Sequence, residues 1–403
     1  MERRDFIKSS VALATSAALG ATPVRAETRL AADSGKARVQ QFRTLGKTGL
    51  KISDISFGAG KLPSASMILR ALDRGINYFD TAPDYGQSET FIGEAIKARP
   101  GDREKFFIAS KFCKPDPYPG HLPLGSGVAD YVGAVEGSLK RLNTDYLDVV
   151  FVHAIGEGRD VEKERQRLTD SNMLEAFYQL KQAGKVRFLA VSSHGPNMLE
   201  DLLLTAVQSM HYHLIMVAFN FLKFPKVPEV IKIAHQNHVG VIAMKTLVGA
   251  KETGIEVGGV PFEHAAFKWV LRHPEVAGLV VTMKSVPDLD LFLGASGAKF
   301  AEADQRVLDH YAGLYGNDYC RTGCGDCEPA CPHGVDIASI LRYQMYFESY
   351  GDEKRAMQSY AALEHPAAVC GSCADEACSN ACPHGLPVGE KLRAAHRSLS
   401  WTV

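Results

Sequence analysis

Eight short apolar segments, separated by longer amphipathic ones, constrain the fold of this chain most strongly. The apolar segments span residues 52–60, 77–82, 106–111, 148–153, 188–193, 214–220, 240–245 and 278–283. Strands buried on both faces require such near-continuous Val, Ile, Phe and Ala content, and the intervening segments have helical spacing. Eight strand and helix repeats over roughly 250 residues predict a closed (β/α)8 TIM barrel across residues 41–300. An open doubly wound sheet is the alternative, disfavoured because no G-x-G-x-x-G turn follows the first strand.

Ionisable side chains stand at the carboxyl ends of three successive predicted strands. These are Asp80, Lys111 and His153, and Tyr85 lies in the loop that follows Asp80. Barrel enzymes place their chemistry at this end of the strands. One such residue alone would be interpreted as a loop charge or a satisfied histidine, but the set of four predicts a shared catalytic site.

Proton affinities indicate what this set can do. A tyrosine has a reference pKa of about 10, and a nearby lysine cation favours the phenolate and lowers that pKa. Asp80 is expected to hold Lys111 in place, and His153 to bind a substrate oxygen. The result is a general acid, Tyr85, beside a carbonyl group, as a carbonyl reduction requires.

Residues 41 to about 300 resemble the aldo-keto reductase family. Residues 75–86, Gly-Ile-Asn-Tyr-Phe-Asp-Thr-Ala-Pro-Asp-Tyr-Gly, are similar to the first signature of that family. Asp80, Tyr85, Lys111 and His153 occupy its four catalytic places in the expected order. The resemblance implies a nicotinamide cofactor, usually NADPH, and reduction of an aldehyde or ketone.

The resemblance also implies cofactor-binding residues, with some departures. The residues at the expected positions are Ser192 and Ser193 for the carboxamide, and Lys284 and Ser285 for the adenosine phosphate. Met216 replaces an expected glutamine, Met244 an expected aromatic residue, and Asp290 a frequent arginine. An acid at that last position would repel a 2'-phosphate, so the choice between NADP(H) and NAD(H) stays open.

Eight of the nine cysteines form two similar runs in the last third of the chain. The runs are Cys320, Cys324, Cys327 and Cys331, and Cys370, Cys373, Cys378 and Cys382. Both end in Ala-Cys-Pro-His-Gly, which indicates a duplicated unit, and both resemble the C-x2-C-x2-C-x3-C-P run of bacterial ferredoxins with one altered spacing each. Two [4Fe-4S] clusters are the prediction. Paired tetrahedral zinc sites and disulfides are the alternatives.

Residues 301–403 are therefore expected to form a small helical, ferredoxin-like iron-sulfur domain. Apolar residues at helical spacing between the two runs predict a helical hairpin. In two-cluster ferredoxins the fourth cysteine of each run serves the other cluster, so Cys331 joins either the second run or its own. His333 and His384 are expected to be structural, Cys113 to be a packing residue, and His194 stays undecided.

The first residues predict export. Arg3 and Arg4 precede Phe-Ile-Lys and a short apolar stretch, which resembles a twin-arginine signal covering residues 1–26, followed by a linker at 27–40. That route moves folded proteins, which suits a chain whose clusters are inserted before export, and predicts a periplasmic location with the twin-arginine machinery as a partner. An ordinary amphipathic start is the alternative. No later stretch approaches a membrane span.

Composition limits the remaining functions. The formal net charge is -1, and no basic face or tail predicts nucleic-acid binding. The first hypothesis is an exported nicotinamide-dependent oxidoreductase that acts on a small carbonyl substrate and exchanges electrons with a redox partner protein through its clusters. The second is an iron-sulfur electron-transfer protein whose barrel is a scaffold with a degraded nucleotide site.

Overall fold

A computed structural model describes residues 36–115, 118–222, 226–249 and 254–400. The predicted export signal and most of the predicted linker lie outside the described residues. Ala37–Val403 forms one compact unit. Within it, the residues just before the barrel are tied to it, because Val39 N donates to Arg74 O and Gln40 N donates to Ser296 Oγ.

The eight predicted strands close into a parallel barrel in the order β12-β3-β4-β5-β6-β7-β8-β9, which confirms the predicted barrel. Their bounds are β3 Ile55–Gly58, β4 Tyr78–Asp80, β5 Phe107–Lys111, β6 Leu147–Val152, β7 Val186–Ser193, β8 Leu214–Ala218, β9 Gly240–Met244 and β12 Gly278–Thr282. A closed barrel has no free sheet edge, so each of these strands has a hydrogen-bonded neighbour on both sides.

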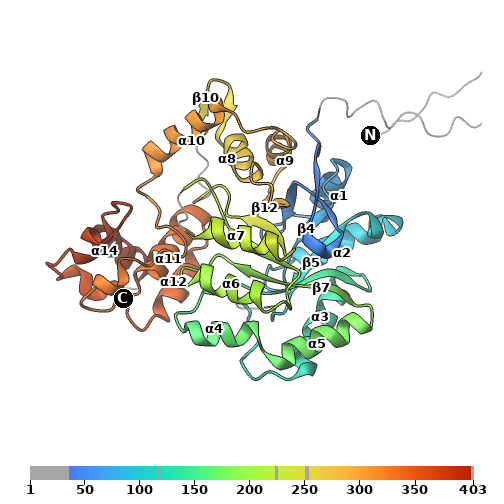
Figure 1. Cartoon of the computed structure of the whole chain (residues 1–403), viewed down its shortest axis with the longest axis horizontal. Helices are drawn as coiled ribbons and strands as arrows, with labels where there is room; N and C mark the ends of the chain where they lie inside the picture. Colours follow the sequence, from blue (N-terminus) through green and yellow to red (C-terminus); the bar gives the residue numbers. More distant parts are fainter. Residues whose placement is uncertain (1–35, 116–117, 223–225, 250–253, 401–403) are drawn as a thin grey trace, which may run out of the picture. The chain divides into compact units, whose positions relative to one another are not determined.

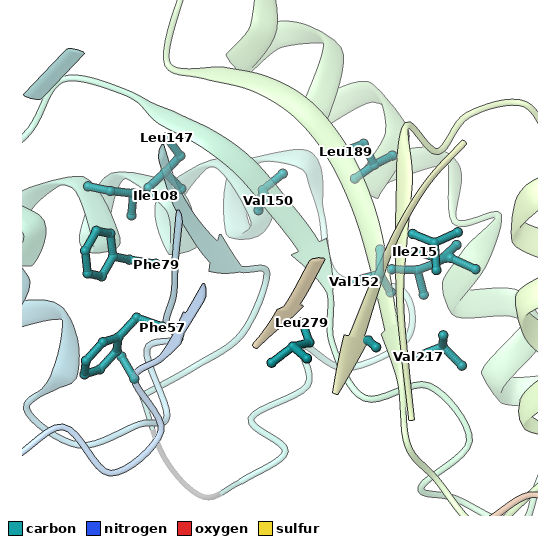
Figure 2. Packing of buried hydrophobic residues seen from close by; sticks show 14 of the residues in the cluster. Phe57, Phe79, Ile108, Leu147, Val150, Val152, Leu189, Ile215, Val217 and Leu279 are labelled. Atoms are coloured by element: carbon teal, nitrogen blue, oxygen red, sulfur yellow. The ribbon is translucent and has the colours of Figure 1, made fainter. Parts of the chain in front are cut away.

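Helices surround this barrel (Figure 1). The main ones are α1 Ala65–Asp73, α2 Ser88–Ala98, α3 Val128–Leu142, α5 Ser171–Gln182, α6 Leu199–Gln208, α7 Val227–Gln236, α8 Phe262–Leu271 and α9 Val286–Leu293. Alternate strand residues point to opposite faces. Phe79 and Val150 therefore belong to the large core cluster that includes helix residues (Figure 2), whereas Tyr78, Val149 and Phe151 belong to a separate cluster formed mainly by strand residues.

Two segments differ from the sequence-based expectation. The predicted strand 52–60 is split at Asp54, and its first part, β2 Lys51–Ser53, pairs instead with β1 Phe42–Thr44 in an antiparallel hairpin. The Asp54 carboxylate accepts hydrogen bonds from Ile55 N, Ser296 Oγ and Gly297 N, which fixes the break. The second difference from a simple strand and helix repeat is that the segment between β6 and β7 contains two helices, α4 Val161–Leu168 and α5.

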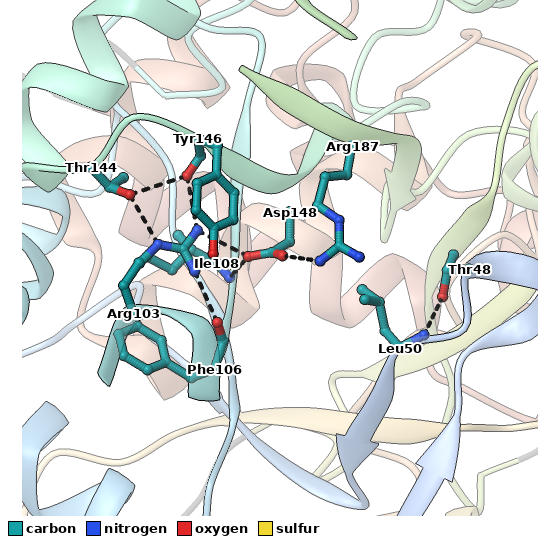
Figure 3. A network of polar contacts seen from close by, with 9 residues as sticks. All are labelled: Thr48, Leu50, Arg103, Phe106, Ile108, Thr144, Tyr146, Asp148 and Arg187. Atoms are coloured by element: carbon teal, nitrogen blue, oxygen red, sulfur yellow. Dashed lines mark hydrogen bonds and ion pairs between the residues drawn. The ribbon is translucent and has the colours of Figure 1, made fainter. Parts of the chain in front are cut away.

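A buried ionic network stabilises the amino ends of β5 to β7 (Figure 3). The Asp148 carboxylate lies 3.0 Å from Arg103 Nη2 and 2.8 Å from Arg187 Nη1, and accepts from Ile108 N at 2.9 Å. The Asp148 side chain is 1% exposed. Because the barrel site is expected at the other end of the strands, this network supports folding and not the site.

The last hundred residues pack as helices against the barrel. Their bounds are α10 Glu302–Tyr315, α11 Ile337–Tyr350, α12 Glu353–Ala361, α13 Ala377–Asn380 and α14 Val388–Leu399. The predicted hairpin is present, since α11 and α12 are joined by Gly351 in the left-handed conformation (φ 63°) and Asp352. Tyr350 Oη at the end of α11 donates to Val248 O of the barrel. Within the described residues no helix has the length and apolarity to cross a membrane.

Candidate active site

A buried ion pair joins the ends of β4 and β5. Lys111 Nζ lies 2.6 Å from Asp80 Oδ1 and donates to Thr81 O at 2.9 Å. The side chains of Lys111 and Asp80 are 2% and 6% exposed. The predicted role of Asp80, to hold Lys111 in place, is therefore consistent with the contact that the structure contains.

Tyr85 and His153 lie beside this pair. Lys111 Nζ is 5.2 Å from the centre of the Tyr85 ring, and the rings of Tyr85 and His153 meet edge to face with centroids 5.9 Å apart. The expected lowering of the Tyr85 pKa is not observed. Burial, followed by the charges of Asp80 and Asp84, raises the pKa of Tyr85 well above 10. The hydroxyl therefore stays protonated at neutral pH and can act as a proton donor.

Asp84 is a site residue that the sequence-based reasoning missed. Its side chain is fully buried, and its Oδ2 lies 3.4 Å from His153 Nδ1. The ligand atoms of Asp84, His153 and Cys113 all lie within 4.8 Å of one another. Burial and then Asp84 raise the pKa of the Cys113 thiol well above 9, which agrees with its expected role as an unreactive packing residue. The position of Asp84 just before Tyr85 was the available signal for including it.

Ser192 and Ser193 lie at the carboxyl end of β7, but their hydroxyls bond within the barrel. Ser192 Oγ accepts from Ala154 N at 3.0 Å, and Ser193 Oγ donates to Ile155 O at 2.7 Å. Both serines are buried. Each hydroxyl helps to fix the loop after β6, so the donor of Ser193 is already used and is not free for a nicotinamide carboxamide.

Lys284 and Ser285 lie between β12 and α9. Ser285 caps that helix, because its Oγ accepts from Asp288 N while the Asp288 carboxylate accepts from Lys284 N and Ser285 N. The Lys284 side chain is exposed, as a lysine that meets a phosphate would need to be. Asp290, the residue expected to repel a 2'-phosphate, lies 2.6 Å from Arg74 Nη1, and this pairing reduces that repulsion.

A second layer of polar residues connects this site to α11. Tyr118 packs edge to face on His153 with centroids 5.2 Å apart, and its hydroxyl lies 3.0 Å from His194 Nε2. His194 Nδ1 lies 2.9 Å from Glu157 Oε1, which also accepts from Tyr346 Oη at 3.4 Å. Burial lowers the pKa of His194 to about 4. The ring is therefore neutral at pH 7, with Nδ1 donating to Glu157 and Nε2 accepting from Tyr118.

The cysteines of the two runs associate as two mixed sets. A small cavity is lined by Cys331 together with Cys370, Cys373 and Cys378. Burial raises the pKa of Cys327, and the next causes are its neighbours Cys320 and Cys382, followed by Glu328 and Cys324. The fourth cysteine of each run thus lies with the first three cysteines of the other run.

The two alternatives for these cysteines can be tested on the same geometry. All nine cysteines are free, which does not favour disulfides. A tetrahedral zinc ion with sulfur ligands at about 2.3 Å brings the sulfur atoms to roughly 3.8 Å from one another. In the described part of the chain, Asp84, Cys113 and His153 are the sole group of three or more such side chains whose ligand atoms all lie within 4.8 Å. Among the described residues, no three of the eight clustered cysteines therefore approach one another as closely as the ligands of one zinc ion would.

The comparisons with known proteins concern the barrel. Residues 61–254 match the model of the Aldo/keto reductase family, so residues 301–403 lie outside that match. "Aldo-keto reductase AMT2" of Alternaria alternata is 26% identical, covering 68% of this chain and 93% of the relative. "L-galactose dehydrogenase" of Arabidopsis thaliana is 33% identical, covering 38% of this chain and 48% of the relative.

A solved structure supports the same fold. The holo form of aldo-keto reductase AKR11C1 from Bacillus halodurans superposes with a TM-score of 0.53 at 24% identity, covering 67% of this chain and 95% of that one. At this identity the likeness concerns the fold alone. It agrees with the closed barrel of eight parallel strands.

Proposed function

We propose that this chain is a nicotinamide-dependent oxidoreductase of the aldo/keto reductase family, whose model matches residues 61–254. In this proposal it reduces an aldehyde or ketone, or oxidises the corresponding alcohol, with Tyr85 as general acid. The observation that carries the proposal is the contact between Tyr85, His153 and the buried pair formed by Lys111 and Asp80. Four ionisable side chains meet at the end of the barrel where such enzymes act.

Each residue has a distinct task in this proposal. When bound, the nicotinamide supplies the hydride that reduces the carbonyl carbon. Tyr85 holds the proton that the carbonyl oxygen needs, and its raised pKa keeps that proton in place until the oxygen becomes basic. Lys111 places a fixed cation 5.2 Å from the phenol ring, which favours the phenolate left behind. Lys284 is the exposed cation available to a cofactor phosphate.

Tyr85→Phe tests the proposal. This change removes the proton donor and keeps the ring, so we expect kcat for carbonyl reduction to fall about 10²- to 10⁴-fold, the usual contribution of a positioned acid. Tyr146→Phe is the matched control, because Tyr146 packs on Arg103 at the amino ends of the strands. Reduction that survives Tyr85→Phe undiminished would show that Tyr85 is not the acid.

We also propose two [4Fe-4S] clusters in the C-terminal domain, which would exchange electrons with a partner protein. The proposal is supported by two sets of four thiols. Burial, and then neighbouring cysteines, raise the pKa of Cys320 and of Cys370, so a cationic group is needed to stabilise the thiolates. The first set is Cys320, Cys324, Cys327 and Cys382, and the second is Cys370, Cys373, Cys378 and Cys331.

Double substitutions distinguish this exchanged ligation from local ligation. If Cys324 and Cys382 serve one cluster, Cys324→Ser with Cys382→Ser keeps the other cluster, with about four iron atoms per chain. Cys324→Ser with Cys331→Ser then removes both clusters. Local ligation predicts the opposite pattern, with iron retained in the second double variant. Iron and acid-labile sulfide in anaerobically purified protein give the answer.

Export is a further part of the proposal, supported by Arg3 and Arg4 before a short apolar stretch. Changing both arginines to lysine should retain the protein in the cytoplasm with its clusters loaded, as followed by cell fractionation. Periplasmic protein at unchanged levels in this variant would contradict the twin-arginine route.

A second candidate function is an electron-transfer protein with a barrel that no longer binds nucleotide. The bonding of Ser193 within the barrel favours it, together with Met244 at an expected aromatic position. Bound nicotinamide in protein purified anaerobically from the exported fraction separates the two. Stoichiometric nucleotide supports the reductase, and its absence, with no binding of added NADPH or NADH, supports the second candidate.

A further inference from the structure

Helices α11 and α12 cover the carboxyl end of β9 and bring aromatic rings to a half-buried lysine, Lys245. Lys245 follows β9 directly and has a left-handed backbone (φ 55°). Its Nζ lies 4.4 Å from the centre of the Tyr350 ring and 5.7 Å from that of Tyr346. A strand from the barrel and a helix from the C-terminal domain therefore form the two sides of one enclosure.

Two arginines from the same helical hairpin converge on this enclosure. The Arg355 guanidinium of α12 lies 3.5 Å from the centre of the Tyr118 ring and 4.4 Å from that of Tyr346. Arg342 of α11 is 7% exposed, and its guanidinium hydrogen-bonds the Thr322 hydroxyl. Cation-π contacts of this kind hold a cation in place without neutralising it.

Among the residues that the structure describes, the charges in this enclosure do not balance. Lys245, Arg342 and Arg355 are opposed by the carboxylate of Glu157, which is itself bonded to His194 and Tyr346. Asp352 is the other acid near Lys245, and it pairs with Lys61 at 2.9 Å. Burial, and then Arg342 and Arg355, lower the pKa of Lys245 to about 7. Charges that are partly removed from water are stabilised by partners of opposite sign, so a further negative charge would be favourable beside these cations.

We propose that Lys245 and Arg355, with Tyr346 and Tyr350, form a binding site for a carboxylate or phosphate group of the ligand that the barrel acts on. The barrel and the C-terminal domain each supply one cation, so the site is complete only when both are present. This inference rests on the proposed carbonyl reduction and adds a substrate class to it, namely carbonyl compounds with an anionic group.

The position of the site fits such a substrate. Tyr118 links it to the catalytic residues, because the centre of this ring lies 3.5 Å from the Arg355 guanidinium and 5.2 Å from the centre of the His153 ring. Arg355 and the residue expected to bind the carbonyl oxygen are therefore both in contact with the Tyr118 ring. The same chemistry also suits a phosphate of the nicotinamide cofactor, and the experiment below distinguishes these two sources.

The test compares 4-carboxybenzaldehyde with methyl 4-formylbenzoate as substrates of the full, cluster-loaded chain. The two share a reacting aldehyde and differ in charge. In Lys245→Met and in Arg355→Met, we expect kcat/KM for the carboxylate to fall about tenfold or more, since a charge-assisted hydrogen bond is lost. For the ester we expect a change of less than about twofold. Lys354→Met is the control, because it removes a cation from the exposed face of the same helix.

Binding measurements complete the test. Calorimetric titrations of the same proteins with inorganic phosphate and with NADPH should show weaker phosphate binding in both variants. If NADPH binding weakens and both aldehydes lose activity equally, the anion is the cofactor's. If the variants prefer the carboxylate over the ester as the unmodified protein does, and bind phosphate and NADPH as tightly, the proposed anion site is wrong. If the unmodified protein reduces neither aldehyde, the proposed reduction of such aldehydes fails separately, and the phosphate titration alone decides on the site.

Discussion

Removing the Lys111 cation should destabilise the barrel, and the reason lies in the burial of its partner. The Lys111 and Asp80 atoms are 2.6 Å apart, and both side chains are almost fully buried. At this distance and an effective dielectric constant of about 20, the attraction is on the order of 6 kcal/mol, against a desolvation cost of several kcal/mol per ion. Lys111→Met leaves the Asp80 carboxylate buried without its cation, which typically costs about 3–5 kcal/mol.

Thermal unfolding followed by circular dichroism measures this effect. At roughly 2–4 °C per kcal/mol, Lys111→Met should lower Tm by roughly 6–20 °C. Lys105→Met is the control, because Lys105 and Asp102 are also 2.6 Å apart but are 71% and 25% exposed, and an exposed pair contributes less than about 1 kcal/mol. Adding Asp80→Asn to Lys111→Met should recover most of the loss. Equal Tm values for the Lys111 and Lys105 variants would refute the reasoning from burial.

Three further predictions concern stability. Asp148→Ala should lower the free energy of unfolding by about 3–5 kcal/mol, because it leaves the buried Arg103 without its carboxylate partner. The kcat/KM of the folded fraction should stay unchanged, and lost activity per folded molecule would contradict this. Burial lowers the pKa of His194 to about 4, below that of the unfolded chain. The stability that the neutral His194 ring gives the fold is therefore complete above pH 6.5 and is lost as the pH falls toward 4. His194→Gln should therefore remove about 2 kcal/mol of the destabilisation between pH 7 and 5, and an unchanged acid slope would argue against it. A Cβ at Gly93 would lie 2.3 Å from a backbone oxygen of α3, whereas one at Gly133 meets nothing within 4 Å. Gly93→Ala should thus lower Tm and Gly133→Ala should raise it, and effects of the same sign would be inconsistent with this packing.

The strands and the catalytic group could be predicted because the sequence encodes them locally. A parallel strand buried on both faces is a continuous apolar run, as in 148–153, and a charge that ends such a run stands out. Asp80, Lys111 and His153 were found in this way. The break at Asp54 was not predicted, because the Asp54 carboxylate is held by Ser296 and Gly297, which lie 242 and 243 residues further along the chain.

The anion site could not be predicted from local patterns for the same reason. Lys245 ends an apolar run and follows the rule for strand ends, but Tyr346 and Arg355 come from helices about a hundred residues further along the chain. In the sequence these two residues belong to an ordinary amphipathic hairpin. Their role depends on how α11 and α12 pack on the barrel, which helical spacing does not specify.

The transfer of deuterium from a nicotinamide labelled at the reactive carbon tests the central claim most directly. If the barrel reduces carbonyl compounds by hydride transfer, the alcohol product carries the deuterium on the former carbonyl carbon, and Tyr85→Phe slows its formation. Product that forms without deuterium, with its new hydrogen derived from solvent, would contradict the account and assign the reduction to electrons delivered from elsewhere.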